Sequence, residues 1–349
     1  MRGDTRRRVR AAVVVLLLLM LKGTPGPEAS AQAVPGLWTK YAANPVFTGG
    51  ATGSWDEVEA FDPSVILDGM TYKMWYTGSG SSGPRRIGYA TSSDGIEWAK
   101  FAGNPVFSEG PPASWDEDGA RWGSVLLDGA VYKMWYTGRD ASGTNRIGYA
   151  TSLNGTDWTK DENNPVFDVG APGSWEDKHV LYPAVIKDGG TYKMWYTGWN
   201  ITTETVQIGY ATSNDGISWT RYSGNPILTW GPPASWDETA VYAASVLLDA
   251  GIYHMWYSGA DGGEWQIGYA TSPDGITWTK HPENPVITEG GPGAFDSDGA
   301  DYPCVVLSSN TYRMWYSGFN NADALYRIGY AYAPALTERS YIPIAMRSY

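Results

Sequence analysis

The chain has 349 residues, of which 42% are hydrophobic and 14% aromatic, and its formal net charge at pH 7 is −12. This length allows one large domain or two ordinary ones. A strongly acidic surface repels phosphate backbones, so we expect no nucleic acid among the partners of this protein.

The first 31 residues have the pattern of a secretory signal peptide. A start rich in arginine precedes an apolar run from Ala11 to Leu21, and Ala29-Ser30-Ala31 offers the small residues of a cleavage site. The run is shorter than the roughly 20 residues that cross a bilayer, which favours a cleaved signal over an N-terminal membrane anchor. We therefore expect a secreted, extracellular protein with no membrane span in the mature chain.

A seven-residue motif, Tyr-Lys-Met-Trp-Tyr-Thr-Gly at 72–78, organises the rest of the chain. It recurs four times with small changes, and its Met stands at positions 74, 134, 194, 255 and 314, a spacing of 59 to 61 residues. The alternation of residue types within the motif is typical of a strand. A regular spacing of this length indicates a repeat architecture.

Each repeat contains four strand-like segments. In the first repeat they are 64–67, 72–77, 86–91 and 97–100, and the dipeptides Asp68-Gly69 and Asp94-Gly95 suit the tight turns of hairpins. Four antiparallel strands in each of five repeats predict an all-β fold, a five-bladed β-propeller over residues 37–333.

The two ends of the repeat region complement one another. The fifth repeat lacks its fourth strand, and Leu37-Trp38-Thr39-Lys40 supplies the missing sequence. We expect this N-terminal strand to close the ring, which leaves no free sheet edge. Residues 334–349 form a C-terminal tail outside the repeats. The longer connections fall at the end of the blades where the first strand begins, so we expect the functional mouth there.

Features that occur in every blade are assigned to architecture. An acid precedes the first strand each time, and we expect it to accept hydrogen bonds from backbone N–H groups of its loop. These acids are Asp56, Asp116, Glu176, Asp237 and Asp296.

The sequence offers little for metal binding or cross-linking. Cys304 is the one cysteine, so it forms no internal disulfide, and its apolar surroundings suggest a small buried hydrophobe. The three histidines do not have the spacing of metal ligands. We predict no metal and no cofactor, and we leave open a central ion.

Residues that differ between the blades are the candidates for catalysis. Asp62, Glu59 and Asp301 are carboxylates that no other blade has at the same position. In glycosidic cleavage one carboxyl group protonates the leaving oxygen, while another activates water or attacks the sugar. Asp62 is therefore the candidate base or nucleophile, and Glu59 or Asp301 the candidate acid, unless these acids only make surface hydrogen bonds. At the position of Asp62 the other blades have Trp122, Tyr182, Ala243 and Tyr302.

Aromatic and cationic residues near this end are candidate substrate contacts. Four tryptophans fall outside the repeated positions, and aromatic faces stack on sugar rings, although packing between loops is an equal alternative. Arg121 and His179 are unique to their blades and would hold a hydroxyl or an anion, or join local ion pairs. The full candidate set is Arg121, Trp122, His179, Tyr182, Trp199, Trp230, Trp265 and Tyr302.

The repeat, with Asp62-Pro63-Ser64-Val65 opening the first blade, resembles the five-bladed glycosidase propellers of glycoside hydrolase families 43, 32 and 130. The resemblance extends over residues 37–333. In family 43 an Asp-Pro motif at this place supplies the general base, which implies that role for Asp62. The other two carboxylates of that family fall on Trp122 and Tyr182 here, so their roles are not carried over. Many members of family 130 are mannoside phosphorylases, and the resemblance to them implies that Arg121, Lys178 and His179 would suit phosphate.

The sequence thus predicts a secreted, monomeric, glycoside hydrolase-like propeller. It would act on polysaccharide or oligosaccharide through carboxylate acid/base chemistry. Two alternatives are a non-catalytic carbohydrate-binding or scaffold propeller and a mannoside phosphorylase-like enzyme. The expected partner is a carbohydrate in each case.

Overall fold

The computed structural model describes residues 38–335. The predicted signal peptide at 1–31 and all but the first two residues of the predicted tail at 334–349 lie outside the described residues. All the regular secondary-structure elements within residues 38–335 are β-strands, so the all-β prediction is confirmed. This part of the chain has no helix long and apolar enough to cross a membrane.

The strands form four-membered groups that follow the sequence repeat. The groups are β2–β5, β6–β9, β10–β13 and β14–β17, and the fifth group is β18–β20 together with β1. The strands are β1 (Thr39–Lys40), β2 (Glu59–Asp68), β3 (Thr71–Ser79), β4 (Arg86–Ser92), β5 (Ala99–Lys100), β6 (Ala120–Asp128), β7 (Val131–Arg139), β8 (Asn145–Ser152), β9 (Trp158–Lys160), β10 (His179–Asp188), β11 (Thr191–Trp199), β12 (Val206–Ser213), β13 (Thr220–Arg221), β14 (Ala240–Asp249), β15 (Ile252–Ala260), β16 (Trp265–Ser272), β17 (Thr279–Lys280), β18 (Gly299–Ser308), β19 (Thr311–Asn320) and β20 (Leu325–Pro334).

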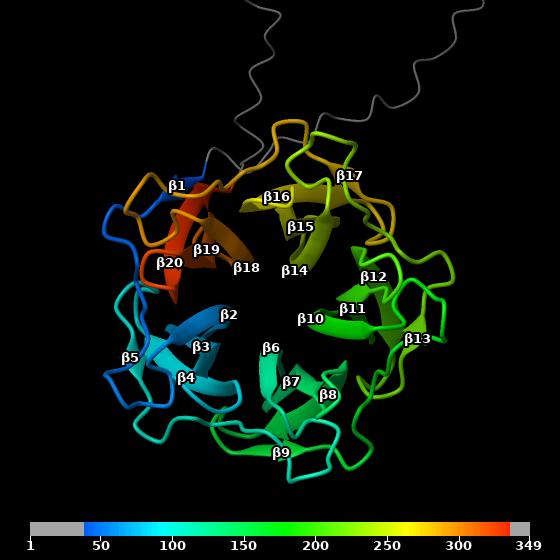
Figure 1. The fold of residues 1–349 in the computed structure, drawn as a ribbon, viewed down its shortest axis with the longest axis horizontal. Helices are drawn as coiled ribbons and strands as arrows, with labels where there is room; N and C mark the ends of the chain where they lie inside the picture. Colours follow the sequence, from blue (N-terminus) through cyan, green and yellow to red (C-terminus); the bar gives the residue numbers. More distant parts are fainter. Residues whose placement is uncertain (1–37, 336–349) are drawn as a thin grey trace, which may run out of the picture. The chain divides into compact units, whose positions relative to one another are not determined.

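Consecutive strands within a group pair antiparallel, and the groups are arranged around a centre in a propeller-like manner. Figure 1 shows the first strand of each group, β2, β6, β10, β14 and β18, nearest this centre. Single parallel pairings join Glu59 to Tyr326 and Val206 to Ala240, between neighbouring groups. The first and last strands of the described chain also pair: β1 is antiparallel to β20, and Lys40 lies opposite Ala331.

The repeated Met-Trp-Tyr segments form the packed interior between groups. Met134, Trp135 and Tyr136 in β7 are fully buried, and their equivalents in the other second strands are at most 1% exposed. Consecutive residues are buried here because each sheet packs against a neighbour on both faces, which hides both sets of alternating side chains. The motif therefore belongs to the framework.

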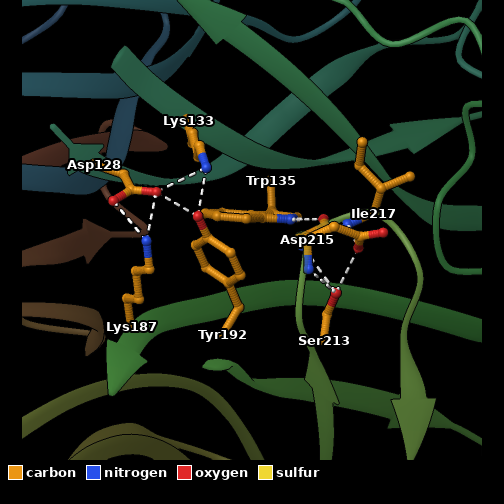
Figure 2. Close-up of polar contacts among 9 residues, drawn as sticks. Asp128, Lys133, Trp135, Lys187, Tyr192, Ser213, Asp215 and Ile217 are labelled. Carbon is orange, nitrogen blue, oxygen red and sulfur yellow. Dashed lines mark hydrogen bonds and ion pairs between the residues drawn. The ribbon is translucent and has the colours of Figure 1, made fainter. Parts of the chain in front are cut away.

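A polar cluster joins the second and third groups (Figure 2). It lies at the end where the inner strand of each group connects to the second strand of that group. We call this end of the inner strands the hairpin end. Asp128 accepts hydrogen bonds from Lys133 and Lys187, both at 2.8 Å, and from the hydroxyl of Tyr192. Beside it, the indole N–H of Trp135 donates to the carbonyl of Gly216 at 2.7 Å. These contacts tie β6 and β7 to the adjacent group.

The recurrent acids hold their loops differently from the prediction. Asp56 accepts hydrogen bonds from the side chains of Tyr76 at 2.9 Å and Lys100 at 2.6 Å, rather than from backbone N–H groups. Side-chain donors suit this site because Asp56 is 2% exposed and the ammonium group compensates its charge. Lys40 in β1 makes the equivalent contact with Asp296 at 2.6 Å.

The prediction that Cys304 is a small buried hydrophobe was wrong in two respects. Its Sγ accepts a hydrogen bond from the N–H of Val65 at 3.1 Å, and the side chain is only partly buried. In the same way, Ser64 Oγ accepts a hydrogen bond from the N–H of Val125 at 3.0 Å. The thiol thus stands in for a serine between two groups, and burial raises the pKa of Cys304 to about 12.

Candidate functional site

An irregular turn of the backbone in each inner strand positions the candidate catalytic residue. In β2 the pairing register shifts between Phe61 and Ser64, and Asp62 between them has a positive φ of 51°. Bulges of this kind redirect a side chain and are frequent next to active sites. The equivalent residues Trp122, Tyr182, Ala243 and Tyr302 have φ values of 48° to 54°. We call Asp62 and these four residues the bulge ring.

Serine and threonine hydroxyls from the neighbouring group of strands hold each member of the bulge ring in place. The backbone N–H of Asp62 donates to Ser317 Oγ at 2.8 Å, and that of Trp122 donates to Thr77 Oγ1 at 3.0 Å. The other three members make the same contact with Thr137, Thr197 and Ser258. A non-glycine residue with positive φ costs about 1 kcal/mol or more, and persists where the surroundings fix it. The backbone at these positions is therefore set by the framework, whatever the side chain.

All five members of the bulge ring line a cavity of about 480 Å³ along the inner strands. Its walls continue to Ile66, Leu126, Ile186 and Leu247, toward the hairpin end. The predicted mouth lay at the opposite end, where the inner strands begin, so the location of the open space differs from the prediction.

Side chains fill the predicted mouth. Phe61, Trp122 and Leu181 come from three different groups and pack into one apolar cluster, with Tyr182, Tyr302 and Tyr326 against it. The rings of Trp122 and Tyr182 lie 4.3 Å apart, and the hydroxyls of Tyr182 and Tyr302 are hydrogen-bonded at 2.8 Å. The bulge ring therefore lies between this aromatic cluster and the cavity.

Asp62 is the carboxyl group of the bulge ring. Its Oδ2 is buried and has no hydrogen-bond partner within residues 38–335. Burial raises the pKa of Asp62 to about 7, although the Thr77 hydroxyl and the charge of Arg85 act in the opposite direction. A carboxyl group with a pKa near neutrality can accept or release a proton in a reaction.

Asp301 is a second carboxyl group with a raised pKa at this end. It is 3% exposed and accepts a hydrogen bond from the Tyr242 hydroxyl at 3.1 Å. Burial raises the pKa of Asp301 well above its ordinary value, and the charge of Asp62 raises it further. The carboxyl group of Asp301 is therefore harder to ionise than that of an ordinary aspartate, and the charge of Asp62 contributes to this.

Glu59 has a different environment. Its carboxylate accepts two hydrogen bonds from Arg85, at 2.8 and 2.6 Å, and one from Ser79 at 2.6 Å. Burial alone would raise the pKa of Glu59, but the hydrogen bonds and charge of Arg85 outweigh it and the pKa is lowered. An ionised carboxylate cannot donate a proton, so the opposite directions of the two pKa shifts favour Asp301 over Glu59 as the acid.

Arg121 is a buried cation beside the aromatic cluster. It is 4% exposed, donates to Asn145 Oδ1 at 2.9 Å, and its guanidinium lies 4.3 Å from the ring centre of Trp122. Its Nε is buried without a hydrogen-bond partner in the described residues. Burial, and then the charge of Arg85, lower the pKa of Arg121 to about 10.

His179 and Trp199 form a separate contact in the third group. His179 Nδ1 accepts the N–H of Asn145 at 3.2 Å, and burial lowers the pKa of His179 to about 4. Lys178 covers the face of Trp199 at 4.6 Å, and the Trp199 indole donates to Glu204 at 2.9 Å. His179 is thus neutral, and one face of Trp199 is occupied.

The last two tryptophans differ in their surroundings. Trp230 is 38% exposed in the connection between β13 and β14. Trp265 packs edge-on against Phe319 at 6.2 Å, and Phe319 lies 4.6 Å from Tyr326 of the aromatic cluster. The structure therefore links Trp265 to the bulge ring through other aromatic residues, and no aromatic contact of residues 38–335 does so for Trp230.

Sequence reasoning missed Arg85, Tyr242 and Tyr326. Arg85 and Tyr326 occupy the position two residues before the repeated Ile-Gly-Tyr of the third strand, where Arg85 directly precedes β4 and Tyr326 is the second residue of β20. That position holds a different residue in every repeat, so a comparison of this column would have identified Arg85 as its one charged member.

Comparison with known proteins places the chain in a family. No family model matches it. The uncharacterised protein MT1551 of Mycobacterium tuberculosis is 31% identical over 278 residues, which cover 76% of this chain and 89% of that protein. The chain belongs to the family of this mycobacterial protein.

Two further matches concern carbohydrate-active proteins. The β-1,2-mannobiose phosphorylase of Thermoanaerobacter is 28% identical over 120 residues, 30% of this chain and 39% of that protein. A solved family 130 structure, reported with glycoside hydrolases that target β-1,2 mannosidic linkages in Candida mannan, covers 86% of this chain and 96% of its own. Its TM-score is 0.69 at 19% identity, a likeness that shows the fold. The resemblance to the glycosidase propellers is therefore confirmed at the level of fold.

Proposed function

We propose that the protein is a secreted, five-bladed propeller that cleaves glycosidic bonds in a polysaccharide or oligosaccharide. The observation on which this rests is Asp62, a carboxyl group in a ring otherwise made of aromatic and alanine side chains. It lines the axial cavity, its Oδ2 has no partner in the described residues, and its pKa is raised to about 7. Perturbed carboxyl groups in cavities are frequent at catalytic sites.

The five blades are the five groups of strands, with β1 as the last strand of the fifth. The pairing of β1 with β20 and the ion pair between Lys40 and Asp296 support this closure, because Lys100 and Asp56 make the same pair within the first group. Export through residues 1–31 is part of the proposal. A mature N-terminus after Ala31, found in the culture medium, would support it.

In the proposed reaction two carboxyl groups have complementary roles. Asp301, whose pKa is raised by burial, donates its proton to the leaving oxygen. Asp62, once ionised, activates a water molecule or attacks the sugar carbon. The pKa of Asp62, raised to about 7, suits proton transfer near neutral pH, and the raised pKa of Asp301 is in the direction that a proton donor requires.

A mannoside phosphorylase is the second candidate. It is supported by the partial similarity to β-1,2-mannobiose phosphorylase and by the cationic Arg121 near the bulge ring. In that case inorganic phosphate would replace water as the attacking group.

The test is an assay of glycan turnover, with and without inorganic phosphate, for the wild-type protein and Asp62→Asn. We expect wild-type turnover of at least one glycan, and a loss of about 10²- to 10⁴-fold in Asp62→Asn. Asp157→Asn is the control, since Asp157 is an exposed carboxylate in the turn between β8 and β9.

The outcomes separate the candidates. Turnover only with phosphate would favour the phosphorylase, and binding without turnover in the wild type would establish the non-catalytic carbohydrate-binding alternative. In an active enzyme, kcat/KM should also fall below about pH 7, because protonation removes the base form of Asp62.

A further inference from the structure

Arg121 is a cation beside the bulge ring that forms no ion pair within residues 38–335. Three other cations near it are paired: Arg85 with Glu59 at 2.6 Å, Arg139 with Asp118 at 3.0 Å, and Lys178 with Glu204 at 2.9 Å. Arg121 instead donates to the neutral amide of Asn145. The site therefore has one uncompensated positive charge.

An unpaired cation is costly at this depth. Arg121 is 4% exposed, and a buried charge without a partner is strongly destabilising. The cation–π contact with Trp122 at 4.3 Å recovers only part of this loss. Arg121 is also unique among the five equivalent positions, so the repeated framework does not require it. A ligand with a negative charge would complete the site.

The first group shows which partner Arg121 lacks. Glu59 pairs with Arg85 there, and the position equivalent to Glu59 in the second group is Gly119. Gly119 has no side chain, and a Cβ at this position would lie 3.3 Å from the carbonyl oxygen of Arg85 and 4.0 Å from Nη1 of Arg121. The second group therefore supplies no carboxylate to Arg121 at the place from which Glu59 reaches Arg85.

The balance of charge favours a ligand group with a single negative charge. His179 is neutral, and the other nearby cations are already paired, so a dianionic phosphate would have one free cation to meet it. A guanidinium matches a planar carboxylate through two parallel hydrogen bonds.

We propose that Arg121 recognises the carboxylate of an acidic sugar, so that the substrate is an oligosaccharide containing uronic acid. This inference rests on the proposed function, since it names the substrate class of the same site.

The test measures binding to matched pairs of short oligosaccharides by calorimetry, in an Asp62→Asn background that suppresses turnover. The pairs are oligomers of glucuronic acid and glucose, galacturonic acid and galactose, and mannuronic acid and mannose. For the sugar that binds, we expect the acidic member to bind roughly 10- to 100-fold more tightly. Arg121→Gln should abolish this preference. Arg139→Gln, which removes the same charge from a more exposed position, should retain it.

The wild-type protein provides a comparison that does not depend on the folding of a variant. Equal or tighter binding of the neutral member would overturn the role of Arg121, and so would competition by inorganic phosphate that is lost in Arg121→Gln. Turnover of neutral glycans with no acidic preference would refute the inference and leave the proposed function standing. Preferential binding of acidic glycans by the wild type without turnover would support the role of Arg121 and refute the proposed function.

Discussion

The two ends of the inner strands use the repeat in opposite ways. At the hairpin end the residue types are repeated, because a lysine, an aspartate and a tyrosine meet at three of the boundaries between groups. At the bulge ring the backbone is repeated, with a positive φ and an N–H···hydroxyl bond in all five groups, while the side chains vary. The repeated contacts at the hairpin end are Asp68–Lys73–Tyr132, Asp128–Lys133–Tyr192 and Asp188–Lys193–Tyr253.

This difference shows how one framework leaves room for a site. The bulge is held by backbone donors and by hydroxyls of the adjacent group, so its geometry does not depend on the side chain at the bulge itself. Asp, Trp, Tyr and Ala can all occupy the position. At the hairpin end the side chains make the contact, and a change there alters the framework.

The largest effect on stability is expected from Trp135→Ala. Trp135 is fully buried and donates its indole N–H to Gly216 of the next group. Truncation leaves a cavity and an unpaired carbonyl, so we expect a loss of about 3–5 kcal/mol in the free energy of unfolding, measured by urea titration. Trp230→Ala, at a 38% exposed position, should change it by less than about 0.5 kcal/mol. Similar losses in both would mean that the repeated tryptophans are not the framework.

The second prediction concerns the pH dependence of stability at the bulge ring. The pKa of Asp62 is about 7 in the folded protein and about 3.9 in an unfolded chain, so its ionisation opposes folding. This penalty is absent below about pH 4 and fully present above about pH 7. Asp62→Asn should therefore be more stable than the wild type at pH 8, by about 2 kcal/mol, and the two should converge at pH 4. Thermal unfolding across this range measures the difference.

Asp128→Asn is the matched change at the hairpin end, and it should show the opposite sign. Hydrogen bonds from Lys133, then those from Lys187 and Tyr192, lower the pKa of Asp128. Its stabilisation is present above about pH 4 and is lost as pH falls further toward the folded pKa. A difference from the wild type that stays constant with pH in either variant would contradict this assignment of charges.

The sequence repeat was sufficient to predict the strands and to single out Asp62. Both follow from local pattern: alternation and Asp-Gly turns give the strands, and alignment of the repeats reveals the residue that differs. The packing at the mouth could not be predicted in this way. Phe61, Trp122 and Leu181 belong to three repeats, and only their arrangement in space shows that they fill one end of the axis.

The side chains that pair with charged residues also could not be predicted from the sequence. The sequence does not reveal the partner of Glu59, because Arg85 is 26 residues away and lies in a loop position that differs in every repeat. The acid at Asp56 was expected to bind backbone donors, although Tyr76 and Lys100 recur with it in the repeats. Recurrence of possible donors together with the acceptor is the signal that would have found the contacts of Asp56. Glu59 and Arg85 are each unique to the first repeat, and that shared uniqueness is the signal for their pair.

The smallest expected effect tests the boundary between the fourth and fifth groups. There His254 replaces the usual lysine, and Asp249 accepts a hydrogen bond from Tyr312 at 3.3 Å. His254→Lys would bring an ammonium group toward Asp249 and Tyr312, as Lys193 lies toward Asp188 and Tyr253. It would also remove the contact of His254 with the Tyr269 hydroxyl, so the net gain should be only about 0.5 kcal/mol. Thermal unfolding at pH 7 should show this gain at low salt and a smaller one at high salt, because ions screen an exposed pair. His281→Lys adds the same charge elsewhere and should show no such gain. If His254→Lys also showed none at low salt, the lysine would not be what strengthens the three repeated boundaries, and the tyrosine–aspartate contact would be sufficient.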